Sequence, residues 1–391
     1  MNILVVIPYY VPAYSYGGPV FSSHSLNKNL AAKGHKVTVV TTDSYDASSR
    51  NSIQKEKIDG VKIIRFRNLS NFLAKNYNAY LPFGFKKWIK NNLKNYDIVH
   101  CHDFFTYQNI IISKYAKTYN IPYIIQPHGV LGKGHIKSKN SFLKLFILKR
   151  FKRVLKHTKY IIALTETEKN GIQRFVKNSK KIRVIPNGIN SVEFRKISKI
   201  DLHKKYNLPS DAKLLFYFGR VQAVKGINYI IEMLSKLQSS SSQFNFHFFI
   251  IGPDEGGEKA RLEKLIKKYQ FEKKITFVGQ LDGELKKQFI KSCDLYIFLS
   301  KGEGLPMTIL EVSGLGIPSM LSKECNVPEI AKANGGYEVD KEDYYTNAKL
   351  VEEHFKNEKK IKTMQKNAQK VIQDKFELDV VVKKILELYK K

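Results

Sequence analysis

Two glutamates with seven residues between them, Glu303 and Glu311, stand in the glycine- and proline-rich stretch KGEGLPMTILEVSGLGIP (301–318). Pro306 suits the first turn of a helix, so Glu303 is expected in the loop before that helix and Glu311 more than one turn inside it. A helix N-terminus favours a negatively charged group, and carboxylates accept hydrogen bonds from vicinal hydroxyls. The pattern predicts a ligand that carries an anionic group beside hydroxyls. The plainer alternative is a solvated turn before a surface helix.

Two cationic side chains follow another apolar run, LLFYFG (214–219). Arg220 comes directly after the run, and Lys225 precedes Gly226 at the start of the next helical pattern. A planar guanidinium and the point charge of an ammonium together suit a diphosphate. Cationic residues in loops are usually only solvated, but open α/β sheets bind their ligands at the carboxyl ends of the strands.

The N-terminal half has two weaker signals of the same kind. Gly17 and Gly18 precede Pro19, so N–H groups at the start of the next helix could approach a phosphate, although a turn alone would also need glycine. His128 follows the run YIIQ (123–126). It is a candidate donor to a sugar hydroxyl or to a developing charge, and the alternative is a histidine that is satisfied within its loop.

Other chemistries find less support. His100 and His102 resemble a metal-binding pair, but no further ligand cluster and no DxD pattern accompanies them, so no structural or catalytic metal is expected. A glycosidase would use Glu303 and Glu311 as its acid and base. That alternative leaves the phosphate-seeking groups unexplained, and we rank it below a binding site for an anionic ligand.

Length and composition indicate a globular protein with two domains. The chain has 391 residues, of which 43% are hydrophobic. Cys101, Cys293 and Cys325 form no metal motif or disulfide framework and indicate a reducing compartment. The first apolar run, MNILVVIPYYVP, predicts a strand rather than a signal peptide, and no run approaches the roughly 20 residues of a membrane span.

Short β-branched runs alternate with helical patterns along both halves of the chain, which is typical of parallel, doubly wound sheets. Two such series predict two Rossmann-like domains that meet near 188–212, where a polar, charged segment interrupts the pattern. The tail FELDVVVKKILELYKK has the pattern of an amphipathic helix. The predicted strands are 3–7, 37–42, 61–66, 97–101, 123–126, 160–165 and 182–186, and then 214–219, 246–252, 275–279, 295–300 and 318–321.

The chain is strongly basic, with 67 Lys and Arg against 35 Asp and Glu and a net charge of +32. Residues 1–193 hold 32 basic and 9 acidic residues, a net charge of +23, which leaves +9 for the rest. Such a field attracts nucleic acid, an anionic membrane or a phosphorylated substrate. No base-reading or stacking motif supports nucleic acid.

The segment 132–160 carries ten of these basic residues and no acidic one. Such a segment is typical of a helix at an anionic membrane surface, and 82–96 with Trp88 is a second candidate. The alternative for 142–156 is a domain helix whose apolar side faces the core. One helical side would hold Phe142, Leu143, Phe146, Ile147 and Phe151, and another Lys149, Lys152, Arg153 and Lys156.

Seven stretches, taken together and in order, resemble the retaining glycosyltransferases of family 4, which have the GT-B fold. They span most of the chain, and their combination is specific although no single stretch is. They are YSYGGP, QPHG, VIPNGI, FGRVQAVKGI, IIGPDEGG, ITFVGQL and GEGLPMTILEVSGLGIP.

The resemblance implies a role for each candidate residue. Arg220 and Lys225 would hold the diphosphate of a nucleotide sugar. Glu303 would bind hydroxyls of its sugar, and Glu311 would bind the ribose. Val278 and Gly279 would lie against the base, His128 near the sugar, and Gly17 and Gly18 at the phosphates. The implied catalytic residues are Arg220, Lys225, Glu303 and His128; the implied substrate-binding residues are Gly17, Gly18, Asn187, Val278, Gly279, Gly304, Leu305 and Glu311; no metal is implied.

The resemblance also implies a division of the chain. It predicts a GT-B fold of two Rossmann-like, doubly wound domains with an inter-domain cleft. Residues 1–190 would bind the acceptor and residues 191–375 the nucleotide sugar. Residues 376–391 would form a helix that packs back on the N-terminal domain.

The expected reaction is a metal-independent, retaining transfer of the hexosyltransferase type. The donor would be a nucleotide diphosphate sugar, expected to be UDP-linked, and no cofactor besides this substrate is expected. The acceptor would be a lipid-linked or cell-envelope glycan, such as lipopolysaccharide or capsule. An anionic membrane surface is the further partner, nucleic acid is not, and the protein is expected in the cytoplasm, peripheral on the inner face of the cell membrane.

Two alternatives stay open. A nucleotide-sugar epimerase of the same fold would convert its sugar nucleotide without an acceptor. A non-enzymatic polyanion-binding protein would bind with a steep salt dependence and show no turnover.

Overall fold

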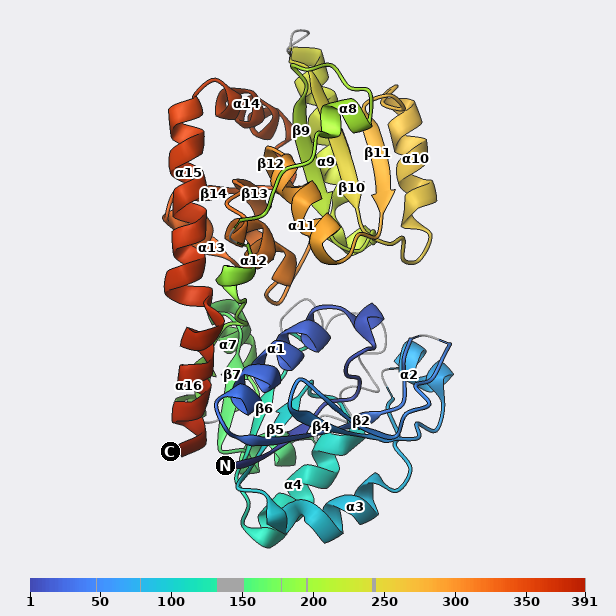
Figure 1. Cartoon of the computed structure of the whole chain (residues 1–391), viewed down its shortest axis with the longest axis vertical. Helices are drawn as coiled ribbons and strands as arrows, with labels where there is room; N and C mark the ends of the chain where they lie inside the picture. Colours follow the sequence, from blue (N-terminus) through green and yellow to red (C-terminus); the bar gives the residue numbers. More distant parts are fainter. Residues whose placement is uncertain are drawn as a thin grey trace. The chain divides into compact units, whose positions relative to one another are not determined.

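The computed structural model describes residues 1–46, 48–77, 79–131, 151–176, 178–194, 196–240 and 244–390. Most of the basic segment 132–160, with Phe142, Leu143, Phe146, Ile147 and Lys149, therefore lies outside the described residues. The chain forms two compact units (Figure 1). The first unit comprises Met1–Gly188 and Leu378–Lys391, and the second comprises Ile189–Glu377.

The first unit is built on a mixed sheet whose described strands have the order β3-β4-β2-β1-β5-β6-β7-β8. All neighbours are parallel except β3 and β4, which pair antiparallel at one edge. The strands are β1 Asn2–Val6, β2 Lys36–Thr42, β3 Lys55–Ile58, β4 Val61–Phe66, β5 Ile98–His102, β6 Tyr123–Gln126, β7 Tyr160–Ala163 and β8 Ile182–Val184. The strand order proceeds outward from β1 in both directions, as in doubly wound sheets.

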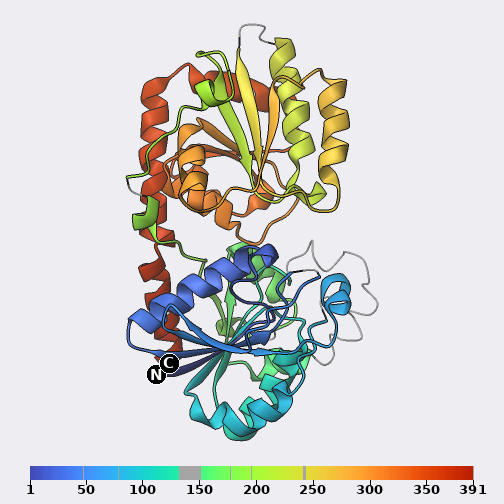
Figure 2. The same cartoon turned by 45° about the vertical axis from the view of Figure 1, so that its right-hand side comes forward.

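Helices lie on both faces of this sheet, as Figure 1 and Figure 2 show. They are α1 Gly18–Ala32, α2 Asn71–Tyr77, α3 Phe85–Asn92, α4 Tyr107–Tyr119, α7 Glu166–Ile172 and α16 Leu378–Lys390, with a further helical stretch at 151–157. Short 3-10 turns are η1 Tyr14–Tyr16, η2 Leu93–Asn95 and η3 Ser179–Lys181.

Side chains of β1 alternate between two apolar clusters, because successive residues of a strand point to opposite faces. Ile3 and Val5 belong to one cluster, together with residues of α1 and α16. Leu4 and Val6 belong to the other, together with residues of α3 and α4. The C-terminal helix thus completes one half of the core of the first unit, with Leu378, Val381, Val382, Ile385, Leu388 and Tyr389.

Both segments that the sequence offered as membrane helices put apolar residues into the core where they are described. In α3, Phe85 and Ile89 are buried, and Trp88 packs half-buried against the same cluster. In 151–157, the buried residues are Phe151, Val154 and Leu155, whereas Lys152, Arg153 and Lys156 are exposed. The described parts therefore have the arrangement of domain helices with lysines in water.

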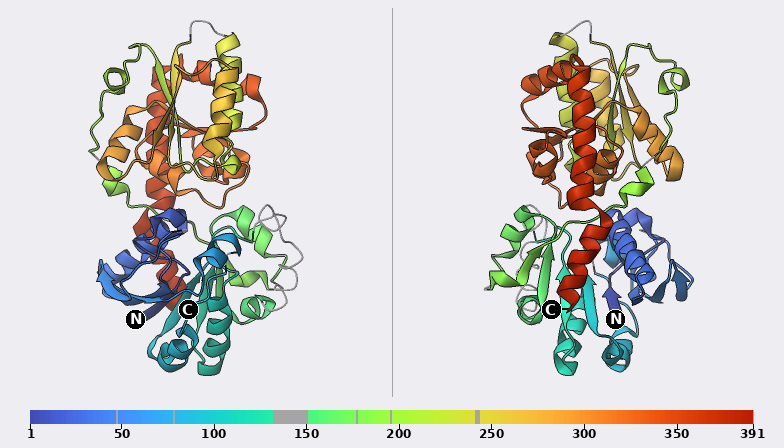
Figure 3. Two further views of the ribbon diagram at one scale, coloured as in Figure 1. Left: turned by 90° about the vertical axis from the view of Figure 1, so that its right-hand side faces the viewer. Right: turned by 60° about the vertical axis from the view of Figure 1, so that its left-hand side comes forward.

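The second unit is built on a fully parallel sheet with the order β11-β10-β9-β12-β13-β14 in its described residues. Its strands are β9 Lys213–Phe218, β10 Phe246–Ile251, β11 Ile275–Gly279, β12 Leu295–Phe298, β13 Ser319–Ser322 and β14 Gly336–Val339. Strands β9, β10 and β12 are buried almost throughout, since helices cover both faces (Figure 3).

From α9 to α14, one helix follows each strand of the second unit, while α8 precedes β9 and α15 follows α14. The helices are α8 Leu202–Lys205, α9 Ile227–Ser240, α10 Glu258–Lys268, α11 Gly283–Ser292, α12 Met307–Gly314, α13 Pro328–Lys332, α14 Tyr344–Phe355 and α15 Glu358–Val371. Shorter turns are η4 Ser191–Phe194, η5 Ala223–Lys225, η6 Lys323–Cys325 and the π-helical η7 Ile372–Phe376. No helix of the described residues is long and apolar enough to cross a membrane.

The predicted fold of two Rossmann-like parallel sheets is confirmed, and each predicted strand is present within a few residues of its predicted bounds. The sequence pattern missed β3 and β14. β3 is the charged segment KEKI and β14 is GYEV, and both are edge strands, which need no continuous apolar run.

One glycine of the second unit offers a test of how tightly the loops pack. Gly226 has φ +70°, and a Cβ built on it would lie 1.9 Å from the carbonyl oxygen of Leu299. Because backbone atoms cannot yield as a flexible side chain can, we expect Gly226→Ala to lower the free energy of unfolding by about 2–5 kcal/mol. Urea unfolding measures this change.

The control is Gly256→Ala. Gly256 has φ +81°, but nothing lies within 4 Å of the place that a Cβ would take. It should lose only the about 1–2 kcal/mol that a left-handed alanine costs. Equal losses in the two variants would contradict the close approach at Gly226.

Candidate active site

Three of the predicted residues of the second unit lie in segments that follow the carboxyl ends of its strands. Arg220 and Lys225 follow β9, and Glu303 follows β12. β9 and β12 are neighbours in the sheet. Since parallel neighbours end at the same edge, the two loops meet.

A backbone seam joins these two loops. The N–H of Lys301 donates to the carbonyl oxygen of Val224 over 2.8 Å, and the hydroxyl oxygen of Ser300 lies 3.0 Å from the same oxygen. Gly226 makes room for the carbonyl of Leu299 in the same seam. The residue between Val224 and Gly226 is Lys225, which is thereby brought beside the loop of Glu303.

Lys225 and Glu303 form an ion pair with little exposure to solvent. The Lys225 Nζ atom lies 2.8 Å from Oε1 and 3.0 Å from Oε2 of Glu303. The hydroxyl oxygen of Ser300 lies 2.7 Å from Oε1 of Glu303, and its one proton can be donated either to this oxygen or to the carbonyl oxygen of Val224. Only 16% of the Lys225 side chain and 10% of the Glu303 side chain are exposed. An ion pair in such a position interacts more strongly than one in water.

Arg220 is held by a different carboxylate. Its Nη1 atom donates to Oε2 of Glu255 over 2.7 Å, and Gln222 Nε2 donates to the same oxygen over 2.6 Å. The phenol of Tyr217 donates to the carbonyl oxygen of Arg220 over 2.8 Å. This pair is more open than the first, so its net contribution to stability is small.

Glu311 lies in α12 and pairs with a lysine of α11. The Lys286 Nζ atom lies 2.7 Å from Oε2 of Glu311, and both side chains are about one-fifth exposed. The same ammonium group lies 5.6 Å from the ring centroid of Phe218. The carboxylate of Glu311 therefore has a fixed cation on one oxygen.

The remaining predicted residues of this unit lie at the end of β11 and before α12. Gly279 ends β11 with φ +80°, and its carbonyl oxygen accepts from the N–H of Gly252 over 2.8 Å. Val278 is half-buried beside it. Gly304 and Leu305 lie directly before α12, with Leu305 buried and Gly304 half-buried.

In the first unit, Gly17 and Gly18 begin α1. Gly17 has φ +80° and is the N-cap residue of α1, and Gly18 is its first residue. The N–H of Gly17 donates to the carbonyl oxygen of Tyr14 over 2.9 Å. The N–H of Val20 donates to the carbonyl oxygen of Gly17 over 3.1 Å, which closes the first turn.

His128 follows β6 in the left-handed region, with φ +56°. Its Nε2 atom lies 2.8 Å from Nδ1 of His102, and the two rings stack with centroids 5.1 Å apart. Burial lowers the pKa of His128 to about 4, so its imidazole is neutral at pH 7. A neutral imidazole can donate one hydrogen bond and accept one.

A buried carboxylate fixes the backbone next to His128. Glu168, in the first turn of α7, accepts from the N–H of Gly129 over 2.6 Å and from the N–H of Leu164 over 2.7 Å. Thr165 caps α7 by accepting from the N–H of Glu168. The spacing T-x-x-E, which begins directly after the apolar run YIIAL, is the signal that could have identified Glu168.

Asn187 belongs to one of two hydrogen-bonded pairs in the first unit, which are Tyr389 with His100 and Gln126 with Asn187. The phenol of Tyr389 lies 2.7 Å from Nδ1 of His100. Burial lowers the pKa of His100 to about 3. Gln126 Nε2 donates to Oδ1 of Asn187 over 3.3 Å. Asn187 is itself buried.

The structure pairs three predicted site residues with partners that sequence reasoning missed. Glu255 holds Arg220, Lys286 holds Glu311, and Ser300 supports Glu303. Glu255 belongs to the glycine-rich stretch GPDEGG, and nothing in that stretch distinguishes its carboxylate from that of any other loop residue. Lys286 lies in a run of charged residues on α11 and carries no distinguishing signal.

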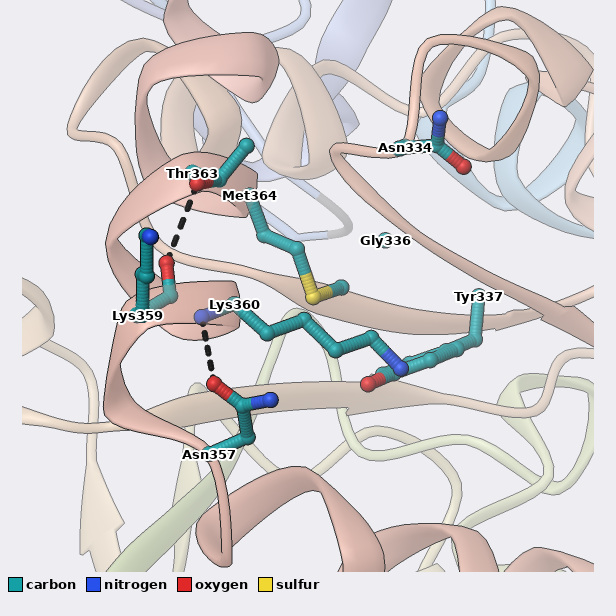
Figure 4. A pocket seen from close by; sticks show the side chains of 8 residues that line it. All are labelled: Asn334, Gly336, Tyr337, Asn357, Lys359, Lys360, Thr363 and Met364. Carbon is teal, nitrogen blue, oxygen red and sulfur yellow. Dashed lines mark hydrogen bonds between the residues drawn. The ribbon is translucent and has the colours of Figure 1, made fainter.

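A separate cavity of about 440 Å³ lies in the second unit and contains none of the predicted residues. Figure 4 shows Lys360 of α15 extended toward Tyr337 of β14, and its Nζ atom lies 5.3 Å from the ring centroid. No group of three or more His, Cys, Asp or Glu side chains suited to a metal ion occurs in the part of the chain that the structure describes. The pair His100 and His102 stacks instead, with ring centroids 4.3 Å apart.

Comparison with protein families gives two matches that together span most of the chain. Residues 16–193 match the family "Glycosyltransferase Family 4", and residues 198–371 match "Glycosyl transferases group 1". The first match contains Gly17, Gly18 and His128. The second contains Arg220 and Glu303.

Individual relatives and solved structures agree with these matches. An uncharacterised glycosyltransferase of Methanocaldococcus jannaschii is 25% identical over 84% of this chain and 82% of its own length. The HepE protein of Anabaena, solved in complex with UDP, superposes with a TM-score of 0.78 at 16% identity and covers 99% of both chains. WaaG, "a glycosyltransferase involved in lipopolysaccharide biosynthesis", superposes with a TM-score of 0.72 at 18% identity over 99% of both chains.

The environment of Glu168 predicts a pH effect. Burial raises the pKa of this carboxyl, and its bonds from Leu164 and Gly129 oppose the rise only in part. A raised folded-state pKa contributes stability below the unfolded value of about 4.3, and this contribution is lost as pH rises through the folded value. We expect the free energy of unfolding of the wild type, relative to Glu168→Gln, to fall between pH 4 and pH 8.

Urea unfolding at a series of pH values measures this difference. The control is Glu166→Gln in the same helix, whose side chain is 68% exposed and whose pairing with Lys169 is a surface contact. The difference in the free energy of unfolding between Glu166→Gln and the wild type should change little over the same pH range. A pH-independent difference for Glu168→Gln would contradict the prediction.

Proposed function

Because the chain belongs to the group 1 glycosyltransferases of family 4 and has the GT-B fold, we propose that it transfers a hexose from a UDP-linked sugar to a glycan of the cell envelope. Glycosyl transfer is the activity of the family. The donor, the acceptor and the retention of configuration at the anomeric carbon are the proposed part.

The observation that carries the proposal is the buried pair of Lys225 and Glu303. When the bond between the anomeric carbon and the diphosphate breaks, negative charge grows on the leaving oxygen. Lys225 supplies a fixed positive charge in a place where water is largely excluded, which makes such stabilisation strong. Its partner Glu303 offers carboxylate oxygens next to that charge, where hydroxyls of the donor sugar would lie.

Arg220 would bind the same diphosphate from the neighbouring loop. A guanidinium has five N–H groups, and in the described residues only Nη1 of Arg220 donates to a side chain. The other N–H groups suit phosphate oxygens in a bidentate arrangement. Because two cationic side chains would bind the leaving diphosphate, the proposed reaction needs no metal ion. EDTA should therefore not reduce the activity.

Glu311 would bind the ribose of the nucleotide. Lys286 engages Oε2 of Glu311, so Oε1 is the oxygen to which ribose hydroxyls would donate. Gly304 and Leu305 stand before the N-terminus of α12, which favours an anionic group. Val278 and Gly279 at the end of β11 would lie against the base.

Residues of the first unit would serve the sugar and the phosphates. The acceptor hydroxyl attacks the anomeric carbon, and its proton would pass to an oxygen of the departing diphosphate. His128 would donate a hydrogen bond to the donor sugar. Gly17 and Gly18 would bring backbone N–H groups near the phosphates at the start of α1, and Asn187 would contribute its amide.

The proposed acceptor is a glycan of the cell envelope, carried on lipid. The support is the likeness to WaaG together with the charge excess of residues 1–193, since lipid-linked acceptors lie at an anionic surface. The first unit would dock there as a peripheral protein on the cytoplasmic face. It exposes lysines and also large apolar side chains, which include Phe21, Ile53, Leu69 and Phe83, at 44%, 51%, 50% and 58% exposure.

The two glutamates give the test of the donor site. Glu303→Gln should reduce turnover by about one to two decades while UDP still binds, because Glu303 faces the sugar. Glu311→Gln should weaken the binding of UDP by a similar factor. Sugar transfer or donor hydrolysis measures turnover, and the dissociation constant of UDP measures binding. The matched control is Glu263→Gln on the exposed side of α10, which should change neither quantity.

The outcome separates this proposal from its alternatives. Near-wild-type kinetics in both variants would show that the donor does not bind at this site. Conversion of the sugar nucleotide without any acceptor would indicate an epimerase. Activity that EDTA abolishes and Mg²⁺ or Mn²⁺ restores would contradict the metal-free mechanism.

Membrane docking is tested with vesicles. We expect the protein to sediment with vesicles that contain phosphatidylglycerol but not with pure phosphatidylcholine, and salt should release it. Each Lys or Arg near an anionic surface contributes about 1 kcal/mol at most, and the effect fades over a Debye length of roughly 8 Å in physiological salt. Replacing Lys152, Arg153 and Lys156 with Glu should therefore reduce binding and leave donor hydrolysis unchanged.

The control makes the same change of charge elsewhere. Lys264, Lys267 and Lys268 are exposed on α10 of the second unit, and their replacement with Glu should alter sedimentation less. Equal binding to neutral and anionic vesicles, or binding to neither, would contradict docking by charge. Lys149 belongs to the same predicted basic side, but it lies outside the described residues and is not part of this variant.

A further inference from the structure

Four large apolar side chains are exposed on one short segment of the first unit. Residues 67–83, which we call the α2 excursion, leave the sheet after β4, include α2 and return to the start of α3 (Figure 1). The exposed side chains are Leu69, Phe72, Tyr77 and Phe83, at 50%, 66%, 58% and 58%. Single exposed apolar side chains are common on protein surfaces, but several on one short segment indicate an interaction surface.

The pairing of the two ends of the excursion decides which side chains point outward. Asn68 lies opposite Pro82 in an antiparallel bridge, and both residues are buried. One backbone hydrogen bond lies on either side of this bridge, with lengths of 3.0 Å and 2.8 Å. Because successive residues of an extended chain point to opposite sides, the neighbours of the bridged pair point away from the core. These neighbours are Arg67, Leu69, Leu81 and Phe83.

Polar groups hold the inner side of the excursion in place. The N–H of Asn68 donates to Oδ1 of Asp43 over 2.8 Å, and Nδ2 of Asn68 donates to the carbonyl oxygen of Ser70 over 2.9 Å. Asp43 is itself paired with Arg50, whose Nη1 atom lies 2.9 Å from Oδ1. The excursion is therefore fixed to the loop after β2 by hydrogen bonds of buried side chains. This attachment does not rely on the four apolar side chains, each of which is at least half exposed.

Two aromatic rings lie side by side on α2. The ring centroids of Phe72 and Tyr77 are 6.5 Å apart, and the ring planes are inclined at 61°. A tyrosine combines an apolar ring with a hydroxyl, which suits the boundary between the lipid headgroups and the acyl chains. The excursion thus presents purely apolar side chains together with an amphipathic one.

The charge around the excursion has one sign. Residues 60–96, which contain it, include eight Lys and Arg and no Asp or Glu. Lys86, Lys87 and Lys90 are exposed on α3, which begins directly after the excursion. An anionic bilayer offers a negative surface with an apolar interior beneath it, so it matches both the charge and the apolar side chains. Nucleic acid would match the charge alone.

We propose that the α2 excursion inserts its exposed apolar side chains into the interfacial region of an anionic bilayer, while the basic residues of 60–96 contact the lipid headgroups. The inference rests on the proposed function only for the lipid-linked acceptor, which makes the membrane the place of the reaction. It assigns the insertion to the excursion and not to a helix in 82–96, because Phe85 and Ile89 of α3 are buried in the core of the first unit. In this arrangement α3 contributes charge and the excursion contributes the apolar anchor.

Tryptophan fluorescence tests the insertion. The chain has one tryptophan, Trp88, so Phe83→Trp is combined with Trp88→Phe to leave a single indole, on the excursion. The probe is a vesicle of phosphatidylcholine and phosphatidylglycerol whose acyl chains carry bromine, which quenches tryptophan on contact. We expect the emission of the Phe83→Trp variant to move to the blue and to fall by about half or more, because an inserted side chain reaches the acyl boundary. Sedimentation with these vesicles without quenching overturns the proposal.

The matched control carries its tryptophan on the second unit. Tyr345 of α14 is 70% exposed, so Tyr345→Trp with Trp88→Phe presents an indole that is at least as accessible. Its emission should not change when the same vesicles are added. Equal quenching of the two variants would show unspecific contact with the bilayer and would overturn the assignment to the excursion.

A pair of double variants measures the contribution to affinity. Leu69→Gln with Phe83→Gln removes two outward apolar side chains and leaves every charge in place. We expect the partition of the protein onto the anionic vesicles to fall by about 10-fold or more, since less apolar surface can be buried in the bilayer. The control is Leu285→Gln with Tyr345→Gln, at 44% and 70% exposure in the second unit, which should stay within about threefold of the wild type. An equal loss in the two double variants overturns the proposal.

Folding and self-association are measured in parallel. Urea unfolding of Leu69→Gln with Phe83→Gln should resemble that of the wild type, because both side chains are exposed. If this variant does not fold, the fluorescence of Phe83→Trp still decides. Sedimentation equilibrium without lipid gives the oligomeric state. A wild-type dimer that Leu69→Gln with Phe83→Gln converts to a monomer would show that the excursion joins two copies of the chain, and it would overturn the proposal.

Failure of this proposal can be told apart from failure of the proposed function. Hydrolysis of a UDP-linked sugar in solution needs no bilayer, so Leu69→Gln with Phe83→Gln should leave it unchanged. If the wild type sediments with anionic vesicles but Phe83→Trp is not quenched, docking by charge stands and only this inference falls. If the wild type binds no vesicle, docking and insertion both fall, whereas the variants of Glu303 and Glu311 still decide on glycosyl transfer.

Discussion

The arrangement of the donor site depends on the contact between the loops after β9 and β12. Gly226 has no Cβ, and the carbonyl of Leu299 occupies that space. The N–H of Lys301 donates to the carbonyl oxygen of Val224 in the same seam. The backbone of Lys225 is therefore held beside the loop of Glu303, and the ion pair joins their side chains. Backbone packing brings the two loops together, and the two charged side chains are then largely shielded from solvent.

The fold followed from the sequence because its signals are local. Runs such as LLFYF in β9 are buried on both faces, so their apolar character is continuous and easy to recognise. The missed strands β3 and β14 are at sheet edges, where one side meets water and charged residues are tolerated. Most of the candidate residues were found for a similar reason, since they stand next to a glycine or proline after a strand, whereas Glu311 was found by its spacing from Glu303.

The partners of those residues could not be predicted in the same way. Glu255 reaches Arg220 from the loop after β10, and Lys286 reaches Glu311 from α11. Both contacts depend on the register between elements far apart in sequence, and a surface lysine or glutamate has no local feature that marks it. Glu168 is an intermediate case, because its capping position was visible but its bond to Gly129 depends on the fold. Arg220, Lys225 and Lys286 are each paired with a carboxylate, so a bound donor would have to exchange or share these contacts.

The first unit consists of two segments that are separated by the whole of the second. Its core includes residues from Leu378 to Tyr389, which are the last part of the described chain. During synthesis on the ribosome, the N-terminal segment emerges before these residues, and the part of its sheet that α16 covers beside α1 stays exposed until they arrive. The second unit has all its residues earlier and can fold first. A nascent chain therefore exposes the part of the β1 face that α16 will cover for the time needed to translate Ile189–Glu377, and a chaperone that binds apolar strands has its substrate there.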